Sequence, residues 1–432
     1  MPSHLVTETI FDPQIQECPY AYYSRMHTLD PVHYDEQADT YLVTTHELIT
    51  QAAADFEVFS SAFDLRREAG GPDSASSDEL FRTKGYLVED VLTQVDPPRH
   101  TAFRNMVKPL FIGPVANSME SFIERHVDEL LDGFIEKESV EFFSEFATPL
   151  PLDMISDQLG VPRKDIGKFK VWTDAIIETL GIMLSEERKQ ECTQRIIEFQ
   201  HYFVAIMEQK RANPSDDIIS FIASARLDHE DRELTVEERL ALIQQLLVAG
   251  NETTRNHLAK IMVLLIQNPE QQETLRNRPD LIKNFVEESL RIESPVQGIF
   301  RKTTRDVTLG GTCIPKDAKV LLMYGAGNRD NTMFADAAKL DINRVNAKRH
   351  LAFGSGPHAC IGSMLARKEL QVSIRQILKR MKDIRFASAD QKLSHKPNLI
   401  LRALDGELNL RFTKTETNRQ SEVCADGHNQ KP

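Results

Sequence analysis

The segment FGSGPHACIG, residues 353–362, places Cys360 in a loop that contains three glycines. Glycine adopts positive φ values without steric cost, so this composition favours a tightly folded loop. A helical pattern begins at Ile361, which predicts that Cys360 lies at a helix N-terminus. Unpaired backbone N–H groups and the helix dipole at such an end stabilise a thiolate. The segment therefore fits either a metal-ligating thiolate or a buried structural cysteine, and for a lone cysteine the structural reading is the commoner one.

Upstream of this loop, the sequence predicts one unusually long helix. Thr235 and Glu238 form a T-x-x-E capping box, apolar periodicity continues to about Gln267, and Pro269 follows. About 32 residues at about 1.5 Å each span roughly 48 Å. Such a helix would cross the whole molecule.

The centre of this helix, AGNETT at residues 249–254, contradicts ordinary helix preferences. Glycine inside a helix costs about 1 kcal/mol relative to alanine, and a threonine hydroxyl can bond back to a carbonyl one turn earlier. A buried glutamate is also expensive unless it has a use. Small residues at Ala249 and Gly250 would let a flat group lie against the helix, with Glu252 and Thr253 beside it. A buried polar cluster that bends the helix explains the segment equally well.

Composition excludes several classes of protein. The 432 residues are 41% hydrophobic and 27% charged, with a net charge of -13. A strongly acidic chain is a poor partner for nucleic acid, because DNA binders must neutralise phosphates. No stretch of about 20 apolar residues occurs, and the N-terminus resembles no signal peptide or membrane anchor. The five cysteines are scattered without a CxxC pair, which favours a reducing cytoplasm over a disulfide framework.

Periodicity predicts a mainly α-helical fold with small β-sheets. Helical stripes recur at residues 119–134 and 196–207, and short strand signals occur in a few places, among them residues 41–44 and 320–323. Near the end, LILRAL and ELNLRF flank Asp405-Gly406 and predict a hairpin across residues 399–412. Residues 1–412 are predicted to form a single domain, with a disordered tail at residues 413–432. The stretch EAGGPDSASS at residues 68–77 is either a linker or a loop over a binding site.

Taken together, these segments resemble the cytochrome P-450 superfamily. The loop around Cys360 is similar to its haem-binding signature, and AGNETT is similar to its central-helix pattern Ala/Gly-Gly-x-Asp/Glu-Thr-Thr. Glu288-Ser-Leu-Arg291 resembles its Glu-x-x-Arg motif, and Arg344 lies where the family places a second arginine. The resemblance runs from about residue 12 to 412 and implies a triangular, α-rich fold. It also implies haem b (iron protoporphyrin IX), with Cys360 as the iron ligand.

The resemblance assigns roles to further residues. Glu252 and Thr253 match the acid–alcohol pair that supplies protons for oxygen activation. Glu288, Arg291 and Arg344 match a network that supports the cysteine loop. The residues that this match places against the haem are Ala249, Gly250, Phe353, Cys360 and Gly362, together with the expected propionate partners His100, Arg104, Arg301 and His358.

The implied reaction inserts one atom of O2 into a C–H bond of a hydrophobic small molecule, such as a terpenoid, steroid, fatty chain or aromatic. The expected pocket walls are mostly apolar, and residues 63–86 would complete them. The side chains or backbone positions expected to form these walls are Leu246, Val248, Ala249, Val296, Gly298, Ile299, Phe300 and Ile400. A peroxide-driven hydroxylase and a haem-based sensor are the alternative functions, and the acid–alcohol pair argues against both.

Electrons must come from another protein, because the sequence has no recognisable flavin or iron–sulfur domain. The resemblance implies a ferredoxin and a ferredoxin reductase, with a small acidic ferredoxin docking on the face nearest Cys360. The basic residues expected to form this docking patch are Arg99, Lys108, Lys348, Arg349 and Arg367.

Overall fold

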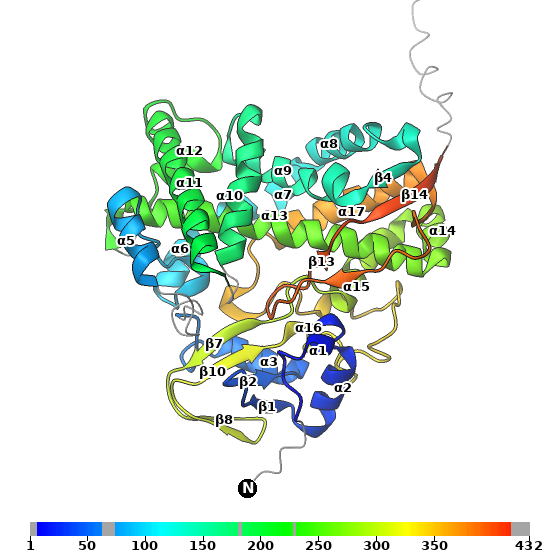
Figure 1. Cartoon of the computed structure of the whole chain (residues 1–432), viewed down its shortest axis with the longest axis horizontal. Helices are drawn as coiled ribbons and strands as arrows, with labels where there is room; N and C mark the ends of the chain where they lie inside the picture. The colour runs from blue at the N-terminus through cyan, green and yellow to red at the C-terminus, as the bar shows by residue number, and fades with distance from the viewer. Residues whose placement is uncertain (1–6, 63–73, 180–183, 228–229, 416–432) are drawn as a thin grey trace, which may run out of the picture.

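A computed structural model describes residues 7–62, 74–179, 184–227 and 230–415. Most of the described chain is helical, and the strands form small sheets, so the predicted fold class is confirmed (Figure 1). None of the helices in these ranges has both the length and the apolar character needed to cross a bilayer. The helices are α1 (Pro13–Glu17), α2 (Tyr20–Leu29), α3 (His46–Ala54), α5 (Ser74–Lys84), α6 (Arg99–Val107), α7 (Gly113–Ser118), α8 (Glu120–Asp132), α9 (Pro149–Leu159), α10 (Ile166–Thr179), α11 (Glu186–Ala212), α12 (Ile218–Ala223), α13 (Val236–Gln267), α14 (Pro269–Asn277), α15 (Ile282–Ile292), α16 (Tyr324–Gly327), α17 (Ser363–Arg380) and the short π-helix η4 (Phe143–Ala147).

The largest sheet has the strand order β1-β2-β10-β7-β3, in which only β2 and β10 pair in parallel. Tyr41 on β2 lies opposite Val320 on β10, so the two strands predicted near these residues are neighbours. A second sheet has the order β11-β14-β4, and three further pairs are two-stranded. The strands are β1 (Val32–Asp35), β2 (Thr40–Val43), β3 (Phe59–Ser60), β4 (Ser139–Glu141), β5 (Arg226–Leu227), β6 (Arg232–Glu233), β7 (Ile299–Thr303), β8 (Val307–Leu309), β9 (Thr312–Ile314), β10 (Lys319–Leu322), β11 (Met381–Phe386), β12 (Ser394–His395), β13 (Leu404–Asp405) and β14 (Asn409–Lys414).

The hairpin predicted around Asp405-Gly406 does not form, although Gly406 does make a turn with φ of +82°. β13 pairs with β12, whereas β14 pairs with β11 and β4. These distant partners bury Leu410 and Phe412 in the main core, which a local hairpin could not do. β14 also continues to Lys414, two residues into the segment predicted as a tail.

Two predicted boundary segments fall partly beyond the described chain. Residues 416–432 of the expected tail lie outside the described residues, as do residues 63–73 of the expected loop. Residues 74–77, which end the predicted linker or loop, belong to helix α5 instead.

Helix α13 crosses the helical part of the molecule, above the five-stranded sheet in the view of Figure 1. Its predicted capping box is confirmed: Thr235 accepts from the Glu238 backbone, and the Glu238 side chain accepts from Thr235. The first half of the helix packs into one apolar cluster through Leu240–Leu247, and the second half into another through Leu258–Leu265. Between them, Ala249 and Gly250 are exposed in the middle of a helix that is otherwise largely buried.

Candidate active site

The loop before α17 folds tightly through glycines in the left-handed region. Gly354 and Gly356 both have φ of +70°. A Cβ atom at Gly356 would lie 2.3 Å from the carbonyl oxygen of Ala53, so only glycine fits against α3. The Cys360 N–H donates to the Phe353 carbonyl at 2.7 Å, which closes the loop on itself. These contacts fix the backbone of Cys360.

The Cys360 side chain is exposed although protein groups surround the loop. Burial by these groups raises the pKa of its thiol, while the backbone N–H groups of Gly362 and Ser363 and the cations Arg104 and Arg367 lower it. The predicted helix N-terminus is present, because α17 begins at Ser363. The effect of this helix end on the pKa of the thiol is smaller than that of burial. A metal ion that coordinates the sulfur would deprotonate the thiol.

A buried ion-pair cluster supports this loop. Arg367 on α17 donates to both oxygens of Glu287 at 2.7 and 3.0 Å, and its guanidinium carbon lies 4.4 Å from the Phe353 ring centre. His350 lies 3.2 Å from the same carboxylate. Although burial opposes ionisation, His350 and Arg367 lower the pKa of Glu287 to about 2. Sequence reasoning missed Glu287, although two adjacent glutamates in an amphipathic helix were a signal that α15 carries buried charge.

The predicted trio of Glu288, Arg291 and Arg344 lies together. Arg291 donates to both Glu288 oxygens at 2.7 Å, and Arg344 Nε donates to the same oxygens at 3.0 and 3.1 Å. The arginines also donate to the backbone carbonyls of residues 328, 335, 336, 337 and 339. The trio thus connects α15 to the chain that precedes the cysteine loop.

At the centre of α13, an open space borders the helix. A Cβ atom at Gly250 would meet no atom within 4 Å, and the same holds at Gly362 beside Cys360. The hydroxyl of Thr253 donates to the Ala249 carbonyl at 2.9 Å, the back-bond expected from the sequence. The Glu252 carboxylate accepts from Arg255 and Asn256 on the same helix.

The cysteine loop and the α13 centre lie against the same packing clusters. Ile361 packs against the cluster that contains Leu246 and Leu247, and Phe353 packs against the cluster that contains Leu258. Cys360 lies between Phe353 and Ile361 in the chain, and Ala249–Gly250 lie between the two clustered halves of α13.

The four basic side chains expected to bind propionates form a partly buried group. The rings of His100 and His358 lie 4.1 Å apart, Arg104 donates to the Ala359 carbonyl at 2.6 Å, and Arg301 donates to the Phe300 carbonyl at 2.7 Å. Burial and then the neighbouring His100 and Arg301 lower the pKa of His358 to about 3. His100 Nδ1 and His358 Nε2 are buried and have no hydrogen-bond partner. Asp96 Oδ1 lies 4.0 Å from His358 Nε2, too far for a hydrogen bond, so the N–H donors of this group remain available to a carboxylate.

These observations fit a haem. Its flat macrocycle requires a face without side chains, which Ala249 and Gly250 provide on α13. Its two propionates require donors, which the unpartnered imidazoles and the arginines supply. Its iron requires an axial ligand, and the exposed thiol of Cys360 is of the type that binds haem iron.

The apolar residues expected to form the substrate pocket divide into two groups. Leu246, Val248, Val296 and Ile299 are buried or half-buried and belong to, or pack against, three apolar clusters, and Ile299 shares a strand face with Arg301. Phe300 points to the opposite face of β7 and packs with Leu42 and Met323. Ile400 packs against that same cluster, and a Cβ at Gly298 would lie 2.9 Å from the Leu322 carbonyl. Phe300 and Ile400 therefore belong to a different apolar cluster from Val296 and Ile299.

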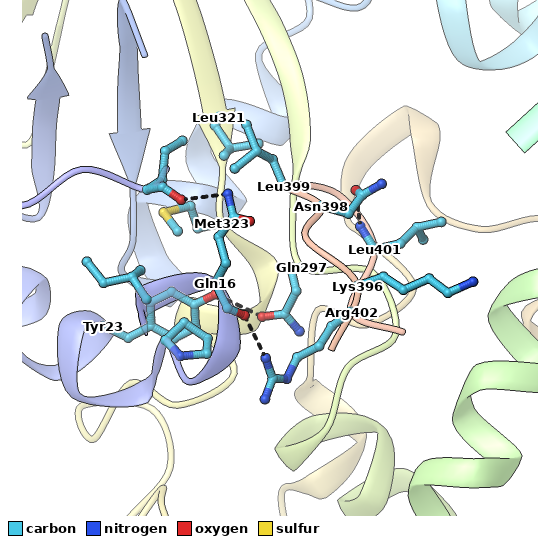
Figure 2. Close-up of a pocket in the computed structure, with 13 residues that line it drawn as sticks. Gln16, Tyr23, Gln297, Leu321, Met323, Lys396, Asn398, Leu399, Leu401 and Arg402 are labelled. Carbon is cyan, nitrogen blue, oxygen red and sulfur yellow. Dashed lines mark hydrogen bonds between the residues drawn. The ribbon is translucent and has the colours of Figure 1, made fainter. Parts of the chain in front are cut away.

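Figure 2 shows a separate small pocket, lined among others by Tyr23, Gln297 and Leu401. Gln297 accepts from the Tyr23 hydroxyl at 2.8 Å and donates to the Ser294 carbonyl at 2.7 Å. The backbone N–H of Gln297 donates to the Ile400 carbonyl at 2.6 Å, which joins the chain after α15 to the chain between β12 and β13. Beside them is a cavity of about 40 Å³, large enough for bound water.

Comparison with known proteins identifies the fold and chemistry. The family described as Cytochrome P450 matches residues 135–403. A cytochrome P450 of Bacillus subtilis (strain 168) is 35% identical over 334 residues, which cover 77% of this chain and 80% of the relative. The structure of CYP109E1 from Bacillus megaterium in complex with testosterone is 30% identical, with a TM-score of 0.79 and coverage of 92% and 99% of the two chains.

A third similarity is to the structure of P450BioI in complex with acyl carrier protein ligated to hexadec-9Z-enoic acid. The two chains are 29% identical with a TM-score of 0.81, and the match covers 93% of this chain and 99% of the other. The match of the family over most of the chain agrees with the cysteine loop, the helix centre and the basic group described above. The chain therefore belongs to the cytochrome P450 family of haem monooxygenases.

Proposed function

We propose that this monooxygenase carries haem b on Cys360, takes protons from Glu252 and Thr253, and hydroxylates a hydrophobic small molecule with electrons from a ferredoxin. When bound, the haem supplies the iron that activates O2, inserts one oxygen atom into a C–H bond and releases the other as water. The observation that supports this best is the combination of the exposed thiol of Cys360 with the buried, unpartnered imidazoles of His100 and His358.

Glu252 and Thr253 are suited to moving and holding protons. The Thr253 hydroxyl donates to the Ala249 carbonyl, which leaves its oxygen lone pairs free to accept a hydrogen bond from a bound group or a water. Glu252 is adjacent in the chain, and its carboxyl group, when protonated, can release a proton and regain one from water. Thr253 does not favour the helix, because alanine forms helix better than threonine.

Replacing Thr253 by alanine is expected to separate donor consumption from product formation. Folding and haem content should be unchanged or slightly improved, because the variant has the better helix former at this position. Without the hydroxyl, reducing equivalents should leave as hydrogen peroxide, and product per donor consumed should fall at least about tenfold. The measurement is donor consumed, peroxide released and product formed in the same reaction.

Glu252→Gln is the matched variant, because it keeps the shape of the side chain and removes the ionisable proton. It should slow donor consumption and product formation together rather than uncouple them. Full coupling in Thr253→Ala would reassign Thr253 to helix structure, and the peroxide-driven and sensor readings would then gain support. Turnover with peroxide alone distinguishes the peroxide-driven enzyme from one that needs O2 and a donor.

The apolar walls favour a hydrophobic substrate. Leu246, Val248, Val296 and Ile299 offer no charged group, and pockets of this kind bind apolar bodies. The related CYP109E1 and P450BioI were captured with testosterone and with a hexadec-9Z-enoic acyl chain. We propose a steroid-like or fatty substrate of similar hydrophobicity. Titration with both classes, followed by the haem Soret band, tests this; a response only to small polar compounds would refute it.

The proposed ferredoxin would approach the face nearest Cys360, but two of the five expected cations are neutralised there. Arg99 pairs with Glu238 at 3.0 Å, and Arg367 pairs with Glu287. Lys108, Lys348 and Arg349 are exposed. The docking surface that we propose joins these three cations to exposed Ile112, Val115 and Met364, where Met364 lies 3.6 Å from the Cβ position of Gly113.

Reversing the charge of Lys348 and Arg349 to glutamate is expected to slow reduction by an acidic ferredoxin about tenfold at low salt, with a smaller effect at high salt. Electrostatic complementarity acts mainly on the association rate, so stopped-flow reduction is the measurement. The control reverses exposed Lys168 and Lys170 on α10, which packs against α9, α11 and α13. Equal slowing in both variants would show a general charge effect and no docking at this face.

The compartment proposed for this system is the cytoplasm. Cys18, Cys192, Cys313 and Cys360 are free thiols in the described part of the chain. Thiols of this kind persist where the medium is reducing.

A further inference from the structure

The carboxylate of Glu252 is held by residues of its own helix. Arg255 Nη1 donates to both carboxylate oxygens at 3.1 and 3.0 Å, and Asn256 Nδ2 donates to Oε1 at 3.0 Å. Arg255 is three residues beyond Glu252 and Asn256 is four beyond, so all three lie on one face of α13. The Glu252 side chain is only 14% exposed, and these contacts therefore take the place of water.

Arg255 is itself anchored from outside the helix. Its guanidinium carbon lies 4.9 Å from the centre of the Phe143 ring, a cation–π distance. Phe143 is buried at the start of the π-helix η4, which packs against α13. The Arg255 Nε is buried without a hydrogen-bond partner. This unsatisfied donor costs free energy, so the other contacts of the side chain must offset that cost.

This geometry has a consequence for proton supply. A carboxyl group that donates a proton must present the O–H bond toward the acceptor and then regain a proton on the same oxygen from water. A side chain that samples many rotamers does this less often, and small misplacements of a catalytic group reduce rates strongly. Arg255 limits the Glu252 carboxylate to one orientation and, through Phe143, ties that orientation to a second element of the fold.

We propose that Arg255 is a positioning residue, which sets the rate of proton supply by orienting the carboxylate of Glu252. The inference rests on the proposed role of Glu252 as proton donor. Arg255 exchanges no proton itself, because its guanidinium does not deprotonate in proteins. It acts through Glu252, and Asn256 completes the arrangement.

The main test is Arg255→Met, which keeps an unbranched stem against Phe143 and removes the donors. Product formation and donor consumption should fall together by about tenfold, as in Glu252→Gln, and the solvent isotope effect on turnover should change. Arg255→Lys should restore at least half of the lost rate, because it keeps a cation that can reach the carboxylate. The control is Arg239→Gln, which removes another ion-paired arginine from α13, and it should leave the isotope effect unchanged.

A double substitution separates positioning from general damage. If Arg255 acts through Glu252, Arg255→Met should cause no further loss in a Glu252→Gln background. A second readout needs no turnover: the infrared carboxylate bands of Glu252, obtained as the difference between the wild type and Glu252→Gln, should shift in Arg255→Met and shift less in Arg255→Lys.

The outcomes distinguish the two hypotheses. If Glu252→Gln leaves turnover unchanged, Glu252 is not the proton donor, and the proposed positioning role of Arg255 is refuted as well. If Glu252→Gln slows turnover while Arg255→Met does not, Glu252 remains the donor and only the positioning role is refuted. Additive losses in the double variant, or unshifted infrared bands in Arg255→Met, would equally overturn the inference.

Discussion

Replacing Glu288 by glutamine is expected to lower the free energy of unfolding by about 3–5 kcal/mol, because one partner of a buried ion pair is removed while its cations stay buried. Glu288 is fully buried and accepts from Arg291, Arg344 and the Asp341 backbone. Both arginines would remain buried next to the chain that leads to the cysteine loop, without their carboxylate partner. Denaturant unfolding followed by circular dichroism measures the change, and haem retention should fall in parallel.

Glu273→Gln is the matched control. Glu273 also pairs with an arginine three residues later, Arg276 at 2.7 Å, but its side chain is 65% exposed. Exposed pairs of this kind contribute less than about 1 kcal/mol, so this variant should be close to the wild type. If the two variants unfolded at the same denaturant concentration, the buried network would have no special role in stability.

The sequence predicts best those elements that depend only on residues close together in the chain. Helix α13 begins and ends where its capping box and Pro269 indicate, because capping depends on residues three apart. The same holds for the glycine loop around Cys360, where two positive φ values follow from glycine itself. The back-bond from Thr253 to Ala249 also lies within one helical turn.

Strand pairing is the clearest failure, because it depends on distant partners. The Asp405-Gly406 turn is present, but Leu410 and Phe412 are buried in the core by pairing of β14 with β11 and β4. Nothing within residues 399–412 carries information about those strands. The alternation of β7 was a local signal that could have been used: it places Ile299 and Arg301 on one face and Phe300 on the other.

The ion pairs around the site were equally inaccessible from the sequence. Arg367 was expected in a docking patch, yet it binds Glu287, 80 residues earlier. Arg99 was expected in the same patch and binds Glu238, 139 residues later. The charge of a residue in the sequence predicts neither whether its side chain is buried nor which residue it pairs with. A basic residue beside a motif can therefore form an internal ion pair that stabilises the motif instead of a docking surface.

Cys360→Ser is expected to abolish the reaction, because a serine oxygen donates far less electron density to iron than a thiolate does. The fold should survive, since the backbone contact of residue 360 with Phe353 does not involve the side chain. Cys192→Ser is the matched control: Cys192 is a buried free cysteine on α11, at 3.8 Å from Glu178, and it has no role in the proposed site. Circular dichroism and haem content check that both variants are folded.

The absorption spectrum of the reduced, carbon monoxide-bound protein tests the assignment of Cys360 most directly. Thiolate ligation gives a strongly red-shifted Soret band, and we expect this band in the wild type and in Cys192→Ser. Cys360→Ser should keep the fold and lose the shift. A Cys360→Ser protein that retained the red-shifted band would show that another residue ligates the iron, and the account of this site would be wrong.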